Sequence, residues 1–159
     1  MIILIDGRSG SGKTELASAL ALRMPGAQLV RLDDIYPGWG GLRAAGEHVQ
    51  RFVLEPRAAH SAARWQRFDW SADAPAEWHE VDPDRPLLIE GCGVLTRANA
   101  RLADVRIWLD APDEVRKRRA LERDGETYEP HWDEWQRQWE SFVARESPES
   151  WADLRLDGS

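Results

Sequence analysis

Lysine is scarce in this 159-residue chain, which contains only Lys13 and Lys117 although arginine is abundant. Acidic residues outnumber basic ones, 28 to 21, and the formal net charge of −7 argues against a nucleic-acid-binding surface. The single cysteine, Cys92, excludes an intramolecular disulfide and fits a reducing compartment. We therefore expect a cytoplasmic protein that acts on small molecules.

Long apolar runs are also absent. No segment approaches the ~20 apolar residues that a membrane-spanning helix needs, so we expect no membrane association. Internal repeats and low-complexity linkers are missing as well, which predicts a single domain over residues 1–159. The sequence gives no indication of the oligomeric state.

A glycine-rich motif near the start of the chain carries the strongest functional signal. Residues 7–14 read G-R-S-G-S-G-K-T and fit the phosphate-binding pattern G-x-x-x-x-G-K-[ST]. Glycines allow backbone N–H groups to converge on phosphate oxygens, and the following helix adds the positive end of its dipole. The motif starts too early for a cleaved signal peptide to precede it. The expected nucleotide-binding residues are Gly7, Ser9, Gly10, Ser11, Gly12, Lys13 and Thr14.

The context of the motif supports nucleotide binding. Residues 2–5 are apolar and largely β-branched, as in a strand buried on both faces of a parallel sheet. Residues 16–24 show the apolar spacing of a helix that ends before Pro25-Gly26. Lys13 is expected to contact the β- and γ-phosphates and to be catalytic, and the Thr14 hydroxyl to bind Mg²⁺.

Carboxylates follow two further predicted strands. Residues 28–32 precede Asp33 and Asp34, either of which could act as a general base, cap a helix or form an Asx-turn. Residues 87–91 form an apolar strand that ends at Glu90, which fits a Walker-B acid that binds Mg²⁺ together with Thr14. Because ligands bind beyond the carboxyl ends of parallel strands, we expect these acids to face the phosphate-binding loop.

The second half of the chain adds strands over residues 105–110 and 152–158 and an arginine-rich helix. That helix is expected to begin near Asp113 and to break at Asp124-Gly125. Its Arg116, Arg119 and Arg123 share one face, which suggests contact with a phosphoryl group, although a salt-bridged, solvated face is the alternative. The apolar stripe of residues 132–142 is expected to be core.

An aromatic and charged segment, residues 64–70, is the candidate acceptor site. Trp70 could stack on a planar ligand, with Asp69 accepting hydrogen bonds from hydroxyls and Arg67 nearby, or the aromatic rings could form a local hydrophobic cluster. Residues 71–86 are rich in proline and acids and should form a surface excursion, with a short edge strand at residues 78–81.

Taken together, these motifs resemble the P-loop nucleoside and nucleoside-monophosphate kinases, most closely the uridine kinase and phosphoribulokinase branch. Residues 33–36 resemble the branch's D-[SN]-[FY]-Y segment, and residues 68–70 resemble F-D-H-P, with Trp70 and Ser71 in place of histidine and proline. Glu90-Gly91 matches the apolar-E-G strand end. Residues 119–124 resemble the R-x-x-x-R-D lid signature.

The resemblance implies an α/β fold, a three-layer α/β/α P-loop NTPase with a five-stranded parallel sheet and a short arginine-rich lid at about residues 116–130. It implies that Asp33 is the general base, that Arg119 and Arg123 are catalytic and close over ATP, and that Mg²⁺ is required. The implied substrate-binding residues are Asp33, Tyr36, Arg67, Asp69 and Trp70.

The expected function is therefore transfer of the γ-phosphoryl group of MgATP to the hydroxyl of a small acceptor, a nucleoside by resemblance. The alternatives are kinases for a nucleoside monophosphate, a sugar acid or an antibiotic hydroxyl, and a regulatory module that binds ATP without transfer. No N-K-x-D motif is present, which argues against a GTPase switch.

Overall fold

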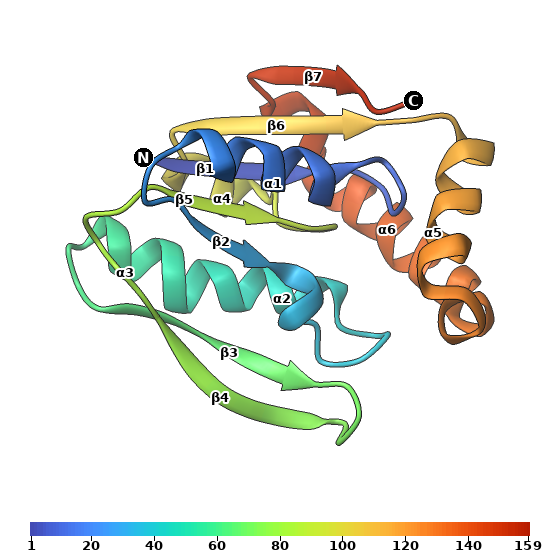
Figure 1. Cartoon of the computed structure of the whole chain (residues 1–159), viewed down its shortest axis with the longest axis horizontal. Helices are drawn as coiled ribbons and strands as arrows, with labels where there is room; N and C mark the ends of the chain where they lie inside the picture. Colours follow the sequence, from blue (N-terminus) through green and yellow to red (C-terminus); the bar gives the residue numbers. More distant parts are fainter.

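The computed structural model describes all residues, 1–159, and is built around a five-stranded parallel sheet (Figure 1). The strand order is β2-β5-β1-β6-β7, and every neighbouring pair is parallel. The chain order reverses at the central strand β1, and it is there that ligands bind in open α/β sheets. The strands are β1 (Ile2–Asp6), β2 (Gln28–Arg31), β5 (Leu87–Glu90), β6 (Val105–Asp110) and β7 (Leu154–Asp157).

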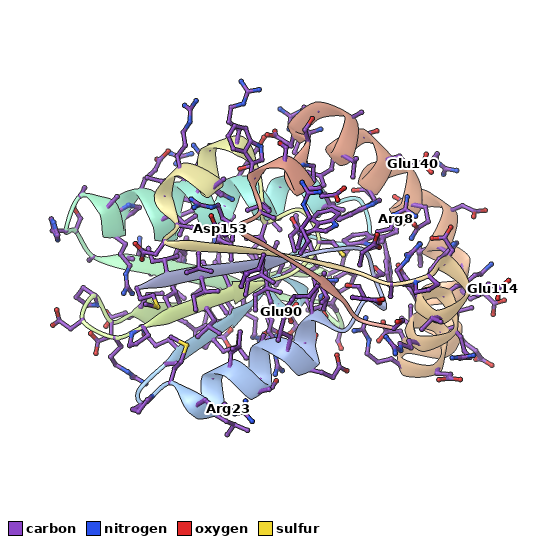
Figure 2. All side chains as sticks on the ribbon, turned by 90° about the horizontal axis from the view of Figure 1, so that it is seen from above. Arg8, Arg23, Glu90, Glu114, Glu140 and Asp153 are labelled. Atoms are coloured by element: carbon purple, nitrogen blue, oxygen red, sulfur yellow. The ribbon has the colours of Figure 1, made fainter.

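Helices cover both faces of the sheet, as Figure 2 shows from above. Because side chains alternate along a strand, Ile3 and Ile5 of β1 pack against α1, whereas Ile2 and Leu4 enter a larger core on the opposite face. That second core of 25 buried residues includes side chains of α2, α4 and α6. The helices are α1 (Lys13–Arg23), α2 (Leu42–Val49), α3 (Glu55–Ala58), α4 (Arg97–Leu102), α5 (Asp113–Tyr128) and α6 (Trp132–Glu146).

The predicted three-layer α/β/α arrangement and the five-stranded parallel sheet are confirmed. The helical stripe of residues 132–142 is largely core, because Trp135, Trp139 and Phe142 are buried. Short helical turns complete the chain: η1 (Leu32–Asp34), the π-helical η2 (Gln50–Leu54) between α2 and α3, η3 (Glu129–His131) and η4 (Pro148–Trp151). None of the helices is both long and apolar enough to cross a membrane.

The segment of residues 71–86 is largely exposed, as expected, and the strand expected at residues 78–81 is the second half of a longer strand in a hairpin. β3 (Ala63–Asp69) pairs antiparallel with β4 (Ala74–Val81) and forms a separate two-stranded sheet beside α2 (Figure 1). The hairpin is tied to α2 through His48, whose Nε2 accepts a hydrogen bond from the Gln66 backbone N–H. The main-sheet edge at β2 is therefore not extended by residues 78–81.

Candidate active site

The phosphate-binding loop is held in an open curve by glycines that no other residue could replace without movement. Gly7 has φ +153° and Gly10 has φ +77°. A Cβ atom at Gly7 would lie 2.0 Å from the Leu109 carbonyl oxygen, and one at Gly10 would lie 2.1 Å from the Arg116 carbonyl oxygen. The loop is therefore shaped both by its own backbone and by close contact with β6 and α5.

The polar groups of the loop fit a bound triphosphate. The Ser11 hydroxyl is buried and has no hydrogen-bond partner in the protein. Lys13, the first residue of α1, is only 7% exposed, and its Nζ donates a hydrogen bond to the Arg8 carbonyl oxygen at 2.9 Å. Ser11 and Lys13 line the same cavity, and a buried hydroxyl without a partner is costly, so these residues suit phosphate oxygens.

Thr14 and Glu90 meet beneath the loop, as the sequence predicted for a magnesium site. The Thr14 hydroxyl donates to Glu90 Oε1 at 3.0 Å. Burial raises the pKa of Glu90, an effect that the charge of Lys13 and the Thr14 hydrogen bond partly offset. No group of three or more His, Cys, Asp or Glu residues forms a metal cluster. Two protein oxygens are sufficient for Mg²⁺, which keeps several waters and binds substrate phosphates as well.

Asp33 lies in η1, at the carboxyl end of β2, and lines the same cavity as Lys13 and Glu90. Its carboxylate charge is close enough to raise the pKa of Glu90 further. None of the chain's hydrogen-bond donors pairs with its carboxylate, whereas its backbone carbonyl accepts a hydrogen bond from Trp70 Nε1 at 2.9 Å. Asp34 does not line the cavity. Of the two acids, Asp33 is the one that faces the site.

The cavity has a volume of about 1360 Å³ and continues from the phosphate-binding loop toward an aromatic region. On one side it reaches Leu109, Leu156 and Gly158 at the carboxyl ends of β6 and β7. On the other it is lined by aromatic rings from four separate segments: Tyr36, Trp39, Trp70, Tyr128 and Trp135.

Arg119 and Arg123 of α5 line this cavity, as predicted, but Arg116 does not. Arg119 donates to the backbone oxygens of Gly10 and Gly158, and Arg123 pairs with Asp124 at 2.9 Å. Arg116 is instead buried and does not present a guanidinium to ligand. It donates to the carbonyl oxygens of Ala111 at 3.1 Å and Ser9 at 3.4 Å and pairs with the Asp113 carboxylate.

The helix break expected at residues 124–125 is also present. Gly125 has φ 51° and ψ −130°, which no helix contains, and the chain bends there before η3. Before Gly125 in the sequence, α5 lies against the phosphate-binding loop. After it, Thr127 and Tyr128 line the aromatic side of the cavity.

Two predicted substrate-binding residues are engaged elsewhere. Arg67 Nε donates to Glu77 across the hairpin at 2.7 Å, and Asp69 Oδ1 accepts hydrogen bonds from the backbone N–H groups of Ser71 and Ala72. Neither residue lines the cavity. The expectation that they contact the acceptor is thus not supported, because a hairpin turn uses the Asp69 carboxylate as its cap. Of this segment only Trp70 reaches the cavity.

Several residues of the site escaped sequence reasoning. Asp6 ends β1, is fully buried, and accepts hydrogen bonds from the backbone N–H groups of Gly7, Gly93 and Leu95. Its position at the end of an apolar strand is the same signal that identified Glu90. Trp39 and Tyr128 had no comparable signal, because their contacts join segments far apart in the chain.

Comparisons with known proteins agree with this geometry. A uridine kinase of Borrelia turicatae is 27% identical, over 77% of this chain and 66% of that protein. A uridine kinase of Ligilactobacillus salivarius is 27% identical over 78% of this chain and 66% of that protein. The alignments thus span slightly less than two thirds of these relatives.

Solved structures show the same fold at low identity. A protein described as a possible uridine kinase from Bacillus stearothermophilus superposes with a TM-score of 0.70 at 19% identity, over 99% of this chain and 88% of that one. Phosphoribulokinase from Rhodobacter spheroides gives a TM-score of 0.64 at 18% identity, over 99% of this chain and 72% of that one. Residues 3–140 match the family model described as AAA domain, so the chain belongs to this family of P-loop proteins.

Proposed function

We propose that this protein is an ATP-dependent kinase that phosphorylates a hydroxyl group of a small uncharged acceptor, a nucleoside in the first instance. The observation that carries the proposal is the presence of Asp33, Lys13 and the Thr14–Glu90 pair in one cavity. The uridine kinases similar to this chain, and the kinase folds that superpose on it, support the same reaction class.

Different residues of the loop would bind different parts of the phosphate donor, MgATP. Backbone N–H groups of the loop, the Ser11 hydroxyl and the Lys13 ammonium would bind the phosphates, and Thr14 with Glu90 would hold Mg²⁺. When bound, MgATP supplies a phosphoryl group whose charge the metal helps to neutralise. Arg119 and Arg123, which line the cavity from α5, would offset charge that develops during transfer.

Asp33 would accept the proton of the attacking hydroxyl. A bond forms between the acceptor oxygen and the γ-phosphorus, the bond from that phosphorus to the β–γ bridging oxygen breaks, and ADP leaves. Asp33 suits the role of base because its carboxylate is not used in hydrogen bonds within the chain and lies at the carboxyl end of β2, facing the cavity.

The charges around the aromatic side of the cavity favour an uncharged acceptor over a monophosphate or a sugar acid. The arginines that could have bound an acceptor phosphate are used elsewhere: Arg67 pairs with Glu77, and the Arg64 guanidinium lies 4.5 Å from the centre of the Trp78 ring. Arg123, which lines the cavity, is paired with Asp124. An acceptor phosphate or carboxylate would meet Asp33 with little compensation.

The experiment that tests the proposal is an acceptor screen that measures ADP release by the purified protein, with nucleosides, nucleoside monophosphates, hydroxy acids and amino sugars. We expect acceptor-dependent release with a nucleoside and little with its monophosphate. Asp33→Asn should reduce turnover by about 10²-fold or more while MgATP still binds. Lys13→Ala should abolish both turnover and MgATP binding.

Asp34→Asn is the matched control, since the neighbouring carboxylate lies outside the cavity, and it should keep turnover within a few-fold. Full activity of Asp33→Asn would remove Asp33 as the base. Binding of MgATP by the wild type without turnover on any acceptor would indicate a regulatory ATP-binding module instead.

A further inference from the structure

Trp39 occupies the centre of an aromatic cluster that joins four segments of the chain. Its indole stacks on His131 of η3, with ring centroids 4.7 Å apart and planes at 7°, and on Tyr128 of α5 at 5.1 Å and 29°. Its edges meet Trp70 of the hairpin at 5.2 Å and Trp135 of α6 at 6.2 Å. Figure 1 shows the loop after η1, the hairpin turn and α5 together at the end of the molecule toward which the main-sheet strands point.

The loop that carries Trp39 has little stiffness of its own. Trp39 lies between Gly38, which has φ +80°, and Gly40-Gly41. Glycine gives the backbone wide conformational freedom, so the position of such a loop depends on what its side chains and carbonyls contact. The Trp39 carbonyl oxygen accepts a hydrogen bond from Gln138 Nε2 at 2.6 Å, and Gln138 Oε1 accepts one from the Leu42 N–H at 3.3 Å.

One arm of the cluster ends on Asp33. Trp70, whose ring abuts Trp39, donates its Nε1–H to the Asp33 carbonyl oxygen at 2.9 Å. The indole N–H of Trp70 has no other role than to donate, and here its acceptor is the backbone of Asp33. The hydrogen bond therefore links the orientation of the Trp70 ring to the backbone position of the proposed base. A shift of Trp39 would therefore be passed to Asp33 through the Trp70 ring.

The other arm ends on the phosphate-binding loop. Tyr128 and Trp135 both donate hydrogen bonds to the Ser9 hydroxyl oxygen, each at 3.0 Å. With both of its acceptor positions used, the Ser9 hydroxyl has its proton free for Cys92 Sγ at 3.7 Å, and the Cys92 thiol donates in turn to the Gly7 carbonyl oxygen. All of these groups are buried, so each hydrogen bond has a cost if it is lost.

We propose that Trp39 is a positioning residue that holds the Asp33 segment and the phosphate-binding loop in one fixed arrangement, through Trp70 on one side and through Tyr128 and Trp135 on the other. The proposal rests on the proposed function in that it takes Asp33 as the base. It adds that the geometry between base and phosphate site is set by this ring, which touches neither Asp33 nor the loop through any hydrogen bond.

The kinetic test uses Trp39→Leu, which removes the stacking surface. We expect kcat to fall at least tenfold with the KM for ATP changed less than threefold, because the cluster contacts the loop at Ser9, whereas the groups that would bind the phosphates include Ser11 and Lys13. Trp39→Phe, which keeps an aromatic face, should recover part of kcat. Trp151→Phe is the matched control, since Trp151 is partly buried, donates to the Glu146 carbonyl oxygen and does not line the cavity.

A second test needs no activity and separates this proposal from the proposed function. Amide hydrogen exchange is measured in peptides that cover residues 8–13 and 32–38, in the wild type, Trp39→Leu and Tyr128→Phe. Tyr128→Phe removes only a hydroxyl and keeps the ring against Trp39. We expect Trp39→Leu to accelerate exchange in both peptides and Tyr128→Phe in the first.

Each outcome decides one of the two claims. Faster exchange in both peptides in a protein without acceptor turnover would support the cluster and refute the kinase function. Wild-type exchange rates in both peptides of Trp39→Leu, or a Trp39→Leu variant with wild-type kcat, would overturn the positioning role. Should Trp39→Leu fail to fold, Trp39→Phe and Tyr128→Phe carry the same comparison.

Discussion

Asp6 is a fully buried acid whose ionisation the fold opposes. Burial raises its pKa from 3.8 to about 6, although three backbone N–H groups and the charge of Lys13 favour the ionised form. Those N–H groups belong to Gly7 at the start of the phosphate-binding loop and to Gly93 and Leu95 after β5. One carboxylate thus joins the start of the phosphate-binding loop to the segment that follows Glu90 of β5.

The raised pKa gives a definite pH dependence of stability. Between pH 4 and pH 6 the folded protein keeps a proton on Asp6 that the unfolded chain has lost, so this contribution to the free energy of unfolding falls as pH rises. A shift of about two units corresponds to about 3 kcal/mol, present below pH 4 and lost above pH 6. Asp6→Asn should lack this dependence.

The measurement is urea unfolding of the wild type and Asp6→Asn at several pH values from 4 to 7. Subtracting the two curves cancels the titration of other groups. Asp6→Asn is expected to be less stable at every pH because its amide N–H₂ opposes one of the backbone donors. A difference between the two proteins that stays constant with pH would contradict the account.

At the scale of elements, the β3–β4 hairpin uses for its own turn a carboxylate that the resemblance to kinases assigns to the acceptor. The Phe68–Trp70 segment resembles a stretch that binds a sugar, yet its carboxylate, Asp69, closes the turn between the two strands. A tight hairpin turn leaves two backbone N–H groups without a hydrogen-bond acceptor from the paired strands. An Asp side chain at the start of the turn can accept both hydrogen bonds. The Phe68–Trp70 segment resembles the family's sequence motif, but only its Trp70 lines the cavity.

Asp69→Ala separates the two roles. We expect a loss of about 1 kcal/mol in the free energy of unfolding, from the two hydrogen bonds to Ser71 and Ala72, and no change in the KM for the acceptor. Asp69→Asn retains an oxygen that can cap the turn and should restore most of the stability. Unchanged stability with a tenfold higher acceptor KM would return Asp69 to the substrate site.

At the scale of the whole molecule, the phosphate-binding loop is compressed between three distant parts of the chain. The backbone of β6 meets Gly7, that of α5 meets Gly10, and Gly158 lies so close to the Ser11 carbonyl oxygen that a Cβ atom would come within 1.9 Å. Arg116 holds this arrangement from inside, with hydrogen bonds to the Ala111 and Ser9 carbonyl oxygens. The loop thus depends on the fold for its shape as much as on its own glycines.

Arg116→Met tests that dependence. Removing a buried guanidinium leaves the carbonyl oxygens of Ala111 and Ser9 without this donor, while the exposed Asp113 keeps Arg8 as a partner. We expect a loss of about 3 kcal/mol in the free energy of unfolding, with weaker MgATP binding. Arg118→Met, on an exposed position of the same helix, should change stability by about 0.5 kcal/mol or less. Urea unfolding and calorimetric titration measure both; equal effects of the two substitutions would refute a structural role for Arg116.

The local patterns of the sequence predicted the parallel strands, the phosphate-binding loop and the helix break at Gly125. Each of these is determined over a few consecutive residues, by apolar runs, by glycine and by helix-breaking chemistry. The pairing of Thr14 with Glu90 also followed, because Thr14 lies in α1 directly after the loop that follows β1, and Glu90 ends the neighbouring parallel strand β5.

What the amino-acid sequence could not determine is which distant side chains meet. The burial of Arg116, the use of Asp69 in a turn and the stacking of Trp39 on His131 and Tyr128 all depend on contacts between segments that only the tertiary structure brings together. The sequence specifies the chemistry of each side chain, but tertiary packing determines which other residues it contacts. For this reason the phosphate-binding site could be predicted from consecutive residues of the sequence. The residues around the proposed acceptor come from distant segments, so only the tertiary structure determines them.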